Sequence, residues 1–128
     1  MKMIFVANEH LATSLQEALA GYFDQLDTAA VDFCYPDHAT GTRELAKILS
    51  DAIAENPAET FVILADAFGS TAYNETQLLL GRTGLTGRAI VVPGMNLPMA
   101  IKYYGLKDSV SVGYLHEIQD ETMERDAG

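Results

Sequence analysis

Short apolar runs alternate with stretches of helical periodicity over most of the chain. Residues 2–7 predict a first strand with a short apolar run, and apolar side chains then recur at the spacing of one helix face, which predicts a helix over about residues 11–24. The segment from Ala29 to Tyr35 predicts a second strand, closed by Pro36-Asp37. Residues 61–65 are continuously apolar, which is typical of a strand buried on both faces. Residues 88–93 predict a fourth strand.

Helical spacing fills the intervals between the later strands. The recurrence of Leu45, Ile48, Leu49, Ala52 and Ile53 predicts a helix that stops before Pro57. The turn Gly69-Ser70-Thr71 predicts the start of a helix through Leu80, and Asn96 can cap a short helix ending near Gly105. This alternation predicts an α/β fold: an open, mostly parallel sheet of about four to five strands with helices on both faces.

The length of 128 residues predicts one domain over residues 1–128. Its tail, residues 109–128, is open to two interpretations. Residues 109–112 alternate like a strand, whereas Leu115, Ile118 and Thr122 step like a helix. Residues 117–126 are strongly polar, as in a solvated helical end or a frayed terminus.

The charge balance narrows the possible partners. The chain has 18 acidic and 8 basic residues and a net charge of -10, with no basic stripe, so we expect neither nucleic acid nor an anionic membrane surface as a partner. The first apolar run is about five residues long, far short of the ~20 of a membrane helix, and no signal-peptide pattern follows it. We therefore expect a cytoplasmic protein.

Cysteine usage limits the chemistry further. The single cysteine, Cys34, rules out an internal disulfide framework, and its apolar surroundings predict a buried, inert thiol. No cysteine and histidine set has metal-ligand spacing, so we expect no metal and no cofactor.

His10 is the strongest candidate for chemistry. It follows the first strand and precedes the first helix, which places it at the carboxyl edge of the sheet, where ligands collect in α/β folds. An imidazole there could accept and donate a phosphoryl group, or it could cap the helix. His38 follows the second strand and could reach the same edge or lie in a surface loop.

Asp66 and the turn after it form the second candidate group. Asp66 ends the third strand, so it shares an edge with His10 if the two strands are neighbours. Its carboxylate could accept the Nδ1–H of the imidazole and leave Nε2 as the nucleophile, or it could serve an Asx-turn. The free N–H groups of Gly69-Ser70-Thr71, with the hydroxyls of Ser70 and Thr71, could bind phosphoryl oxygens. No Walker sequence is present.

Together these segments resemble the mannose-family enzyme IIA components of the bacterial phosphoenolpyruvate-dependent sugar phosphotransferase system. The resemblance covers residues 1–106 and rests on residues 4–12, 64–74 and 94–99. It implies a phosphotransferase in which His10 takes a phosphoryl group on Nε2 from phospho-HPr. His10 then passes the group to a cysteine or histidine of a IIB domain during sugar uptake. It also implies that Asp66 orients the imidazole and that Ser70 and nearby amides hold the phosphate.

The same resemblance implies a homodimer in which a C-terminal segment contacts the partner subunit, and membrane contact only through permease subunits. Two residues depart from the family pattern. Glu9 stands where a small residue, often Ser, is usual, and Leu11 stands where Gly is usual. We expect Glu9 to repel an incoming phosphate if it points inward, or else to raise the basicity of His10, and we expect Leu11 to narrow the approach of HPr.

Three other functions fit parts of the pattern. A phosphotransfer subunit serving dihydroxyacetone kinase also uses a strand-end histidine. A regulatory or sensor domain could keep the fold without carrying phosphate. A response-regulator receiver would be phosphorylated on Asp66, but it needs an acidic pair after the first strand and a lysine after the fifth, and Glu9 and Lys107 meet neither need. The sequence does not identify the sugar.

Overall fold

Four parallel strands form the central sheet in the computed structural model, which describes residues 1–108, 111–115 and 117. The strands lie in the order β2-β1-β3-β4, so β1 is flanked by the two strands that follow it in the chain. The α/β fold and the parallel sheet are confirmed, with four strands in the described part of the chain. Their bounds are β1 Lys2–Asn8, β2 Thr28–Phe33, β3 Phe61–Ala65 and β4 Ala89–Val92.

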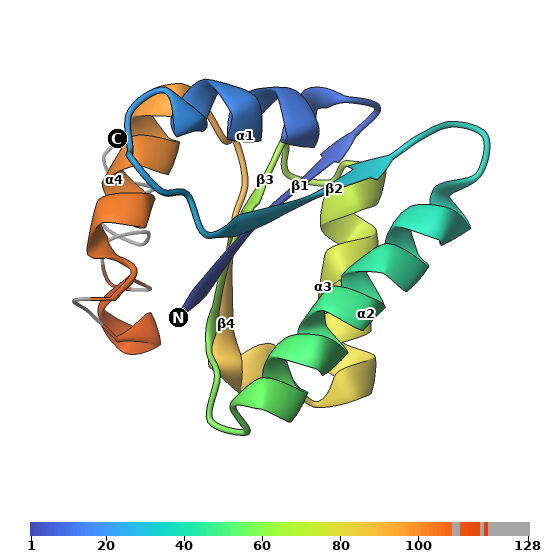
Figure 1. The fold of residues 1–128 in the computed structure, drawn as a ribbon. Helices are drawn as coiled ribbons and strands as arrows, with labels where there is room; N and C mark the ends of the chain where they lie inside the picture. Colours follow the sequence, from blue (N-terminus) through green and yellow to red (C-terminus); the bar gives the residue numbers. More distant parts are fainter. Residues whose placement is uncertain (109–110, 116, 118–128) are drawn as a thin grey trace.

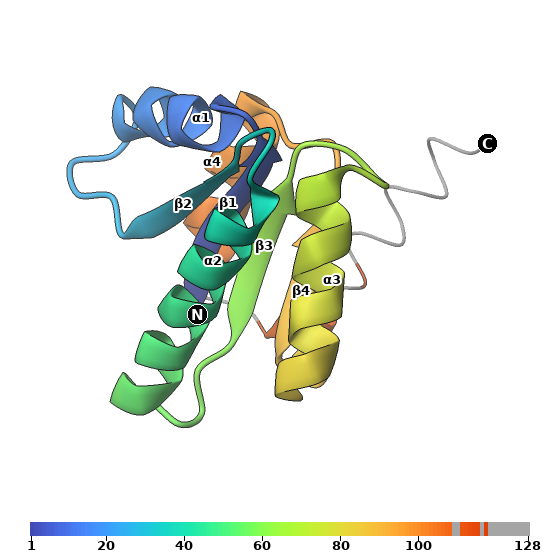
Figure 2. The same ribbon diagram turned by 90° about the vertical axis from the view of Figure 1, so that its right-hand side faces the viewer.

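The helices cover both faces of this sheet. Helices α1 (Leu11–Ala20) and α4 (Leu97–Leu106) lie on one face, and α2 (His38–Glu55) and α3 (Thr71–Thr83) lie on the other (Figure 1). A short 3-10 helix, Thr86–Arg88, leads into β4. The carboxyl ends of the strands all point the same way, toward the top of Figure 2.

The core has one half on each side of the sheet. Successive strand residues point to opposite faces, so Ile4 and Val6 pack with α2 and α3, whereas Met3 and Phe5 pack with α1 and α4. All five residues of β3 are fully buried, in agreement with the continuous apolar run that predicted a strand covered on both faces.

The first helix is shorter than its apolar periodicity predicts. It ends at Ala20 rather than near residue 24, and the N–H groups of Gly21 and Tyr22 donate to carbonyls three residues back, which tightens the last turn. Phe23 leaves the helix to pack edge-on against Tyr104 of α4, with ring centroids 4.5 Å apart. Tertiary packing therefore overrides the local pattern here.

The tail is described only in part. Residues 112–115 are helical and Leu115 is fully buried in the α1/α4 half of the core, so the helical spacing at this position is the pattern that the fold uses. The other tail predictions, a dimer contact or a frayed end over 109–128, fall largely on residues 109–110, 116 and 118–128, which lie outside the described residues.

Gly41 lets α2 approach the sheet closely, because an added Cβ would lie 2.8 Å from the ring of Phe33. We expect Gly41→Ala to lower the free energy of unfolding by about 1–2 kcal/mol, since overpacking costs about 1–3 kcal/mol and helix propensity offsets up to ~1 kcal/mol. Gly81→Ala is the matched control, because nothing lies within 4 Å of its added Cβ, and it should raise that free energy by about 0.5–1 kcal/mol. Urea unfolding measures both, and changes of the same sign would contradict this packing account.

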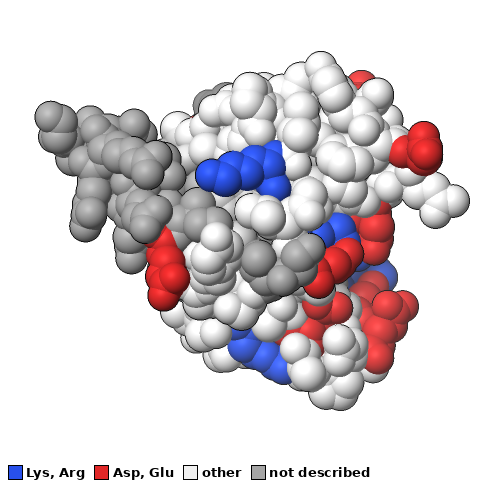
Figure 3. Space-filling model, turned by 90° about the vertical axis from the view of Figure 1, so that its left-hand side faces the viewer, with Lys and Arg blue, Asp and Glu red and all other residues white. Residues whose placement is uncertain are grey.

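On the one face drawn in Figure 3, basic side chains form no continuous stripe, as the sequence predicts. On the face shown in Figure 3, lysine and arginine side chains lie apart from one another, with acidic side chains between and beside them. Within the described residues, no helix has both the length and the apolar character needed to cross a membrane.

Candidate functional site

The carboxyl ends of β1 and β3 meet at one point on the edge of the sheet. The backbone N–H of Asn8, at the end of β1, donates to Oδ2 of Asp66, just beyond β3, at 3.0 Å. The Asn8 side-chain oxygen accepts from the N–H of Ala72 in the first turn of α3, also at 3.0 Å. Asn8 thus ties β1 to both the Asp66 turn and α3. The structure accordingly places His10 and Asp66 at the same end of adjacent strands.

His10 lies at the N-cap position of α1 but does not cap it. Its side chain is exposed and forms no capping hydrogen bond. Asp32 of β2 does this instead, accepting hydrogen bonds from the Thr13 N–H and hydroxyl. Among the described residues, no hydrogen bond to the His10 ring is recorded. The capping interpretation is therefore wrong, and the imidazole is left accessible from solvent.

The Asp66 carboxylate is held in place by three donors. Its Oδ1 accepts from the Ala67 N–H at 2.9 Å and from the Ser70 hydroxyl at 2.6 Å, while Oδ2 accepts from the Asn8 N–H. Within the described chain, no hydrogen bond joins Asp66 to His10. The local bonds to Ala67 and Ser70 match the Asx-turn interpretation. Oδ2 carries one of these three bonds, and a carboxylate oxygen can accept two.

The start of α3 offers amide donors next to Asp66. Ser70 caps the helix by accepting from the Tyr73 N–H at 3.1 Å, so its hydroxyl is engaged both as donor and as acceptor. Across the described residues, the N–H groups of Phe68, Gly69 and Thr71 have no recorded partner. Gly69 has a φ of 79°, a conformation that glycine adopts without strain. Unpartnered amides at a helix start favour an anion.

His10 also belongs to a group of possible metal ligands that spacing along the sequence did not predict. One potential ligand atom each from Glu9, His10 and Cys34 lies within 4.8 Å of the others. The group depends on the register of β1 against β2, in which Asn8 pairs with Phe33, so residues 9–10 come beside residue 34. This strand pairing brings Cys34 next to His10 and Glu9, which lie 24 and 25 positions away in the sequence, so no local motif predicts the group.

Hydrogen bonds join Glu9 to the segment that contains Cys34. Glu9 has a φ of 57°, which is rare for a residue other than glycine. Its N–H donates to the Phe33 carbonyl at 2.9 Å, and its Oε1 accepts from the Tyr35 N–H at 2.9 Å. The Cys34 thiol donates to the Glu9 carbonyl oxygen, with 3.7 Å between sulfur and oxygen.

Cys34 is half-buried, so the prediction of a buried thiol is wrong: it lies just past β2, at the rim of the sheet rather than in its core. Partial burial, followed by the charges of Glu9, Asp32 and Glu44, raises the pKa of the thiol above its ordinary value. Cys34 therefore carries its proton at neutral pH.

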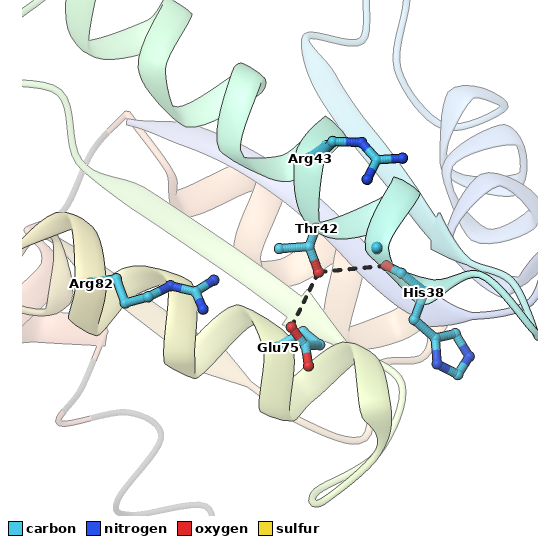
Figure 4. A pocket seen from close by; sticks show the side chains of 6 residues that line it. His38, Thr42, Arg43, Glu75 and Arg82 are labelled. Atoms are coloured by element: carbon cyan, nitrogen blue, oxygen red, sulfur yellow. Dashed lines mark hydrogen bonds between the residues drawn. The ribbon is translucent and has the colours of Figure 1, made fainter.

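His38 does not join this edge group. It is the first residue of α2 and lines a pocket of about 310 Å³ between α2 and α3 (Figure 4). Across this pocket the Thr42 hydroxyl donates to the Glu75 carboxylate at 3.2 Å, and Arg43 and Arg82 approach from the two helices.

Solved structures with this fold include three with TM-scores of 0.69–0.73. The phosphotransferase system component EIIA from Streptococcus agalactiae has a TM-score of 0.73 at 16% identity, covering 98% of this chain and 93% of that chain. The mannose/sorbose-specific IIA subunit from Enterococcus faecalis has a TM-score of 0.69 at 24% identity, covering 94% and 90%. A sigma-54 interaction domain protein from Enterococcus faecalis has a TM-score of 0.70 at 10% identity, covering 99% and 93%.

At these identities the likeness establishes the fold alone. A comparison with curated proteins gives no match. The sequence comparison with protein families is decisive, because the model for EIIA-man, described as PTS system fructose IIA component, matches residues 2–119. The chain belongs to the EIIA-man family of the phosphotransferase system, and this membership supports a phosphotransfer role in sugar uptake.

Proposed function

We propose that the protein is a phosphocarrier that accepts a phosphoryl group from phospho-HPr on Nε2 of His10 and passes it to a cysteine or histidine of a IIB domain. The observation that carries this proposal is the exposed His10 ring, free of any recorded hydrogen bond in the described chain, at the end of the strand beside Asp66. A nucleophile that serves two protein partners in turn must be accessible from solvent to both.

The transfer needs no cofactor. The Nε2 lone pair of His10 attacks phosphorus as the bond between phosphorus and the donor nitrogen of HPr breaks, and the electron pair of that bond stays with HPr. Asp66 accepts the Nδ1–H of His10 and stabilises the positive charge that builds on the ring. In the second step an acceptor atom of IIB attacks phosphorus, and the phosphorus–Nε2 bond breaks. To form the hydrogen bond from Nδ1–H to Asp66, the His10 ring must turn toward Oδ2 of Asp66.

The turn that opens α3 would hold the phosphoryl oxygens. The N–H groups of Gly69 and Thr71 have no recorded partner in the described structure and lie within five residues of Asp66 in the chain. The Thr71 hydroxyl adds a further donor. Ser70 holds Asp66 and the start of the helix, and its hydroxyl can donate to phosphate only after leaving Asp66.

Three exposed apolar side chains provide a contact surface for protein partners at this edge. Leu11 begins α1 and is 49% exposed, Tyr35 follows β2 and is 79% exposed, and Phe68 follows β3 and is 77% exposed. Each side chain belongs to a segment that starts or ends at the carboxyl edge where His10 lies. Exposed Leu11, where Gly is usual in the family, adds apolar surface beside His10 that a partner can contact, and its expected narrowing of the approach of HPr stays a prediction. We propose that HPr and the IIB domain dock here in turn.

Incubation with phosphoenolpyruvate, enzyme I and HPr tests the proposal. We expect an acid-labile, base-stable phosphate on the protein, which requires every component of the mixture. Addition of a cognate IIB domain should then discharge it. A protein that acquires no phosphate under these conditions would instead be a regulatory or sensor domain of the same fold, and discharge by a dihydroxyacetone kinase rather than by IIB would identify the kinase subunit.

Glu9 should slow this transfer. One of its carboxylate oxygens lies within 4.8 Å of a His10 ring nitrogen, so a negative charge stands beside the site of phosphoryl attachment. We expect Glu9→Gln to speed phosphorylation by roughly 2- to 5-fold at low salt and by less at high salt, because the repulsion is screened.

Single-turnover transfer from purified phospho-HPr, with a metal chelator present, measures this rate. Glu17→Gln, on an exposed position of α1, is the matched control and should leave the rate unchanged. An equal or lower rate for Glu9→Gln would show that Glu9 does not oppose the phosphate.

The homodimer stays a prediction. Light scattering of the purified protein measures its mass directly, and a mass twice that of the 13.9 kDa chain is expected.

A further inference from the structure

We propose that Glu9, His10 and Cys34 form a Zn²⁺ site at the carboxyl edge of the sheet, and that an ion bound there blocks His10. The blocking of His10 rests on the phosphocarrier role proposed above, whereas zinc binding itself does not. The group departs from the sequence expectation of no metal, which considered spacing along the chain alone.

The three side chains already converge. One potential ligand atom from each lies within 4.8 Å of the other two. With Zn–N near 2.0–2.1 Å and Zn–S near 2.3 Å, tetrahedral ligand atoms lie about 3.4–3.6 Å apart, so the widest pair must close by at most about 1.2–1.4 Å. Glu9 and His10 are exposed, so rotation of their side chains can supply this movement. A fourth position stays open to water.

Hydrogen bonds to the backbone place Glu9 and Cys34 before any ion binds, so the exposed His10 ring supplies most of the closing movement. The thiol-to-carbonyl hydrogen bond brings Cys34 beside Glu9 in the metal-free protein and is given up when zinc displaces the thiol proton, whereas the Tyr35 N–H bond to one oxygen of the Glu9 carboxylate remains. A hydrogen bond of this kind orients a ligating carboxylate. The unusual left-handed backbone at Glu9 turns its side chain toward the end of β2 rather than along α1.

The donor set selects the metal. A thiolate sulfur, an imidazole nitrogen and a carboxylate oxygen are the three protein ligand types of zinc, whereas Mg²⁺ and Ca²⁺ prefer oxygen alone. The Glu9 carboxylate, with an oxygen within 4.8 Å of the other two ligand atoms, brings a negative charge that attracts a divalent cation. Binding releases the thiol proton to solvent and leaves sulfur as the thiolate ligand.

Zinc and phosphate would compete for the one free lone pair of the His10 ring. A neutral imidazole has one nitrogen with a free lone pair, because its other nitrogen carries a proton. An ion that takes this lone pair removes the nucleophile that the phosphoryl group requires. Zinc would therefore hold the carrier in an inactive state, and its removal would restore it.

Titration of untagged wild-type protein with Zn²⁺ alone, followed by calorimetry, tests the binding. We expect one ion per chain and at least about a tenfold loss of affinity in Cys34→Ser, since loss of even a supporting group costs 10- to 100-fold. Co²⁺ should give a sulfur-to-cobalt charge-transfer band in wild type that Cys34→Ser lacks. His38→Gln, a histidine outside the group, is the control and should bind like wild type. Binding that Cys34→Ser leaves unchanged, or no binding, would overturn the site.

Single-turnover transfer from purified phospho-HPr, with and without Zn²⁺, tests the blocking. The ratio of the two rates is measured within each variant, so it is independent of the basal rate. We expect zinc to slow wild type and His38→Gln at least tenfold and to change Cys34→Ser little. Zinc that binds through Cys34 without slowing transfer would overturn the blocking. Cys34-dependent zinc binding in a protein that phospho-HPr never labels would contradict the phosphocarrier role while leaving the site in place.

Discussion

His10→Gln is expected to abolish phosphorylation by phospho-HPr while leaving the fold intact. The His10 side chain is exposed, makes no hydrogen bond within the described chain and does not cap α1, so its replacement removes no hydrogen bond. Glutamine keeps a polar side chain but has no nucleophilic nitrogen. We expect no acid-labile phosphate on this variant and a change in the free energy of unfolding within about 0.5 kcal/mol.

His38→Gln is the matched control for this result. His38 lies at the start of α2, lines the pocket between α2 and α3, and is not one of the residues proposed to bind or position the phosphoryl group. It should be labelled as fast as wild type. Full labelling of His10→Gln, or loss of label in His38→Gln, would show that a residue other than His10 carries the phosphoryl group.

Asp66→Asn is expected to slow phosphoryl transfer by roughly 10- to 150-fold. The carboxylate is proposed to stabilise the charge that builds on the His10 ring, and a hydrogen bond to a charged group contributes about 1.5–3 kcal/mol, at about 1.4 kcal/mol for each factor of ten. In the folded protein, the amide oxygen of asparagine can still accept from Ala67 and Ser70. Its NH₂ group, however, would face the Asn8 N–H, donor against donor.

We therefore expect Asp66→Asn also to lower the free energy of unfolding by about 1–3 kcal/mol, the cost of leaving a donor unsatisfied. Transfer rates measured well below the melting temperature separate the two effects. Asp51→Asn makes the same chemical change in an exposed ion pair with Lys47 on α2 and should affect neither quantity appreciably. A transfer rate for Asp66→Asn equal to wild type would rule out the proposed role of the carboxylate.

Local patterns were sufficient to predict the order of strands and helices. The unbroken apolar run of β3 indicated a strand covered on both faces, and the structure buries all five of its residues. The end of α1 was not predictable in this way, because the contact of Phe23 with Tyr104 joins segments that are 81 positions apart. The helix stops where that tertiary contact becomes available.

The candidate site shows the same division. A strand followed by a histidine, and another followed by an aspartate, suffice to place His10 and Asp66 at one edge once the strands are neighbours. The hydrogen bond from the Asn8 N–H to Asp66 depends on how β1 pairs with β3, and the group of Glu9, His10 and Cys34 depends on how β1 pairs with β2. Register between strands is fixed by the whole core, so no short motif encodes either feature.

The most direct test of the account is the position of the phosphoryl group after transfer from purified phospho-HPr. Nuclear magnetic resonance of protein carrying ¹⁵N-labelled histidine distinguishes the two ring nitrogens and, with the His10→Gln variant, assigns the residue. We expect a phosphoryl group on Nε2 of His10. A phosphoryl group on Asp66 or on another histidine, or a protein that phospho-HPr leaves unlabelled, would contradict the account.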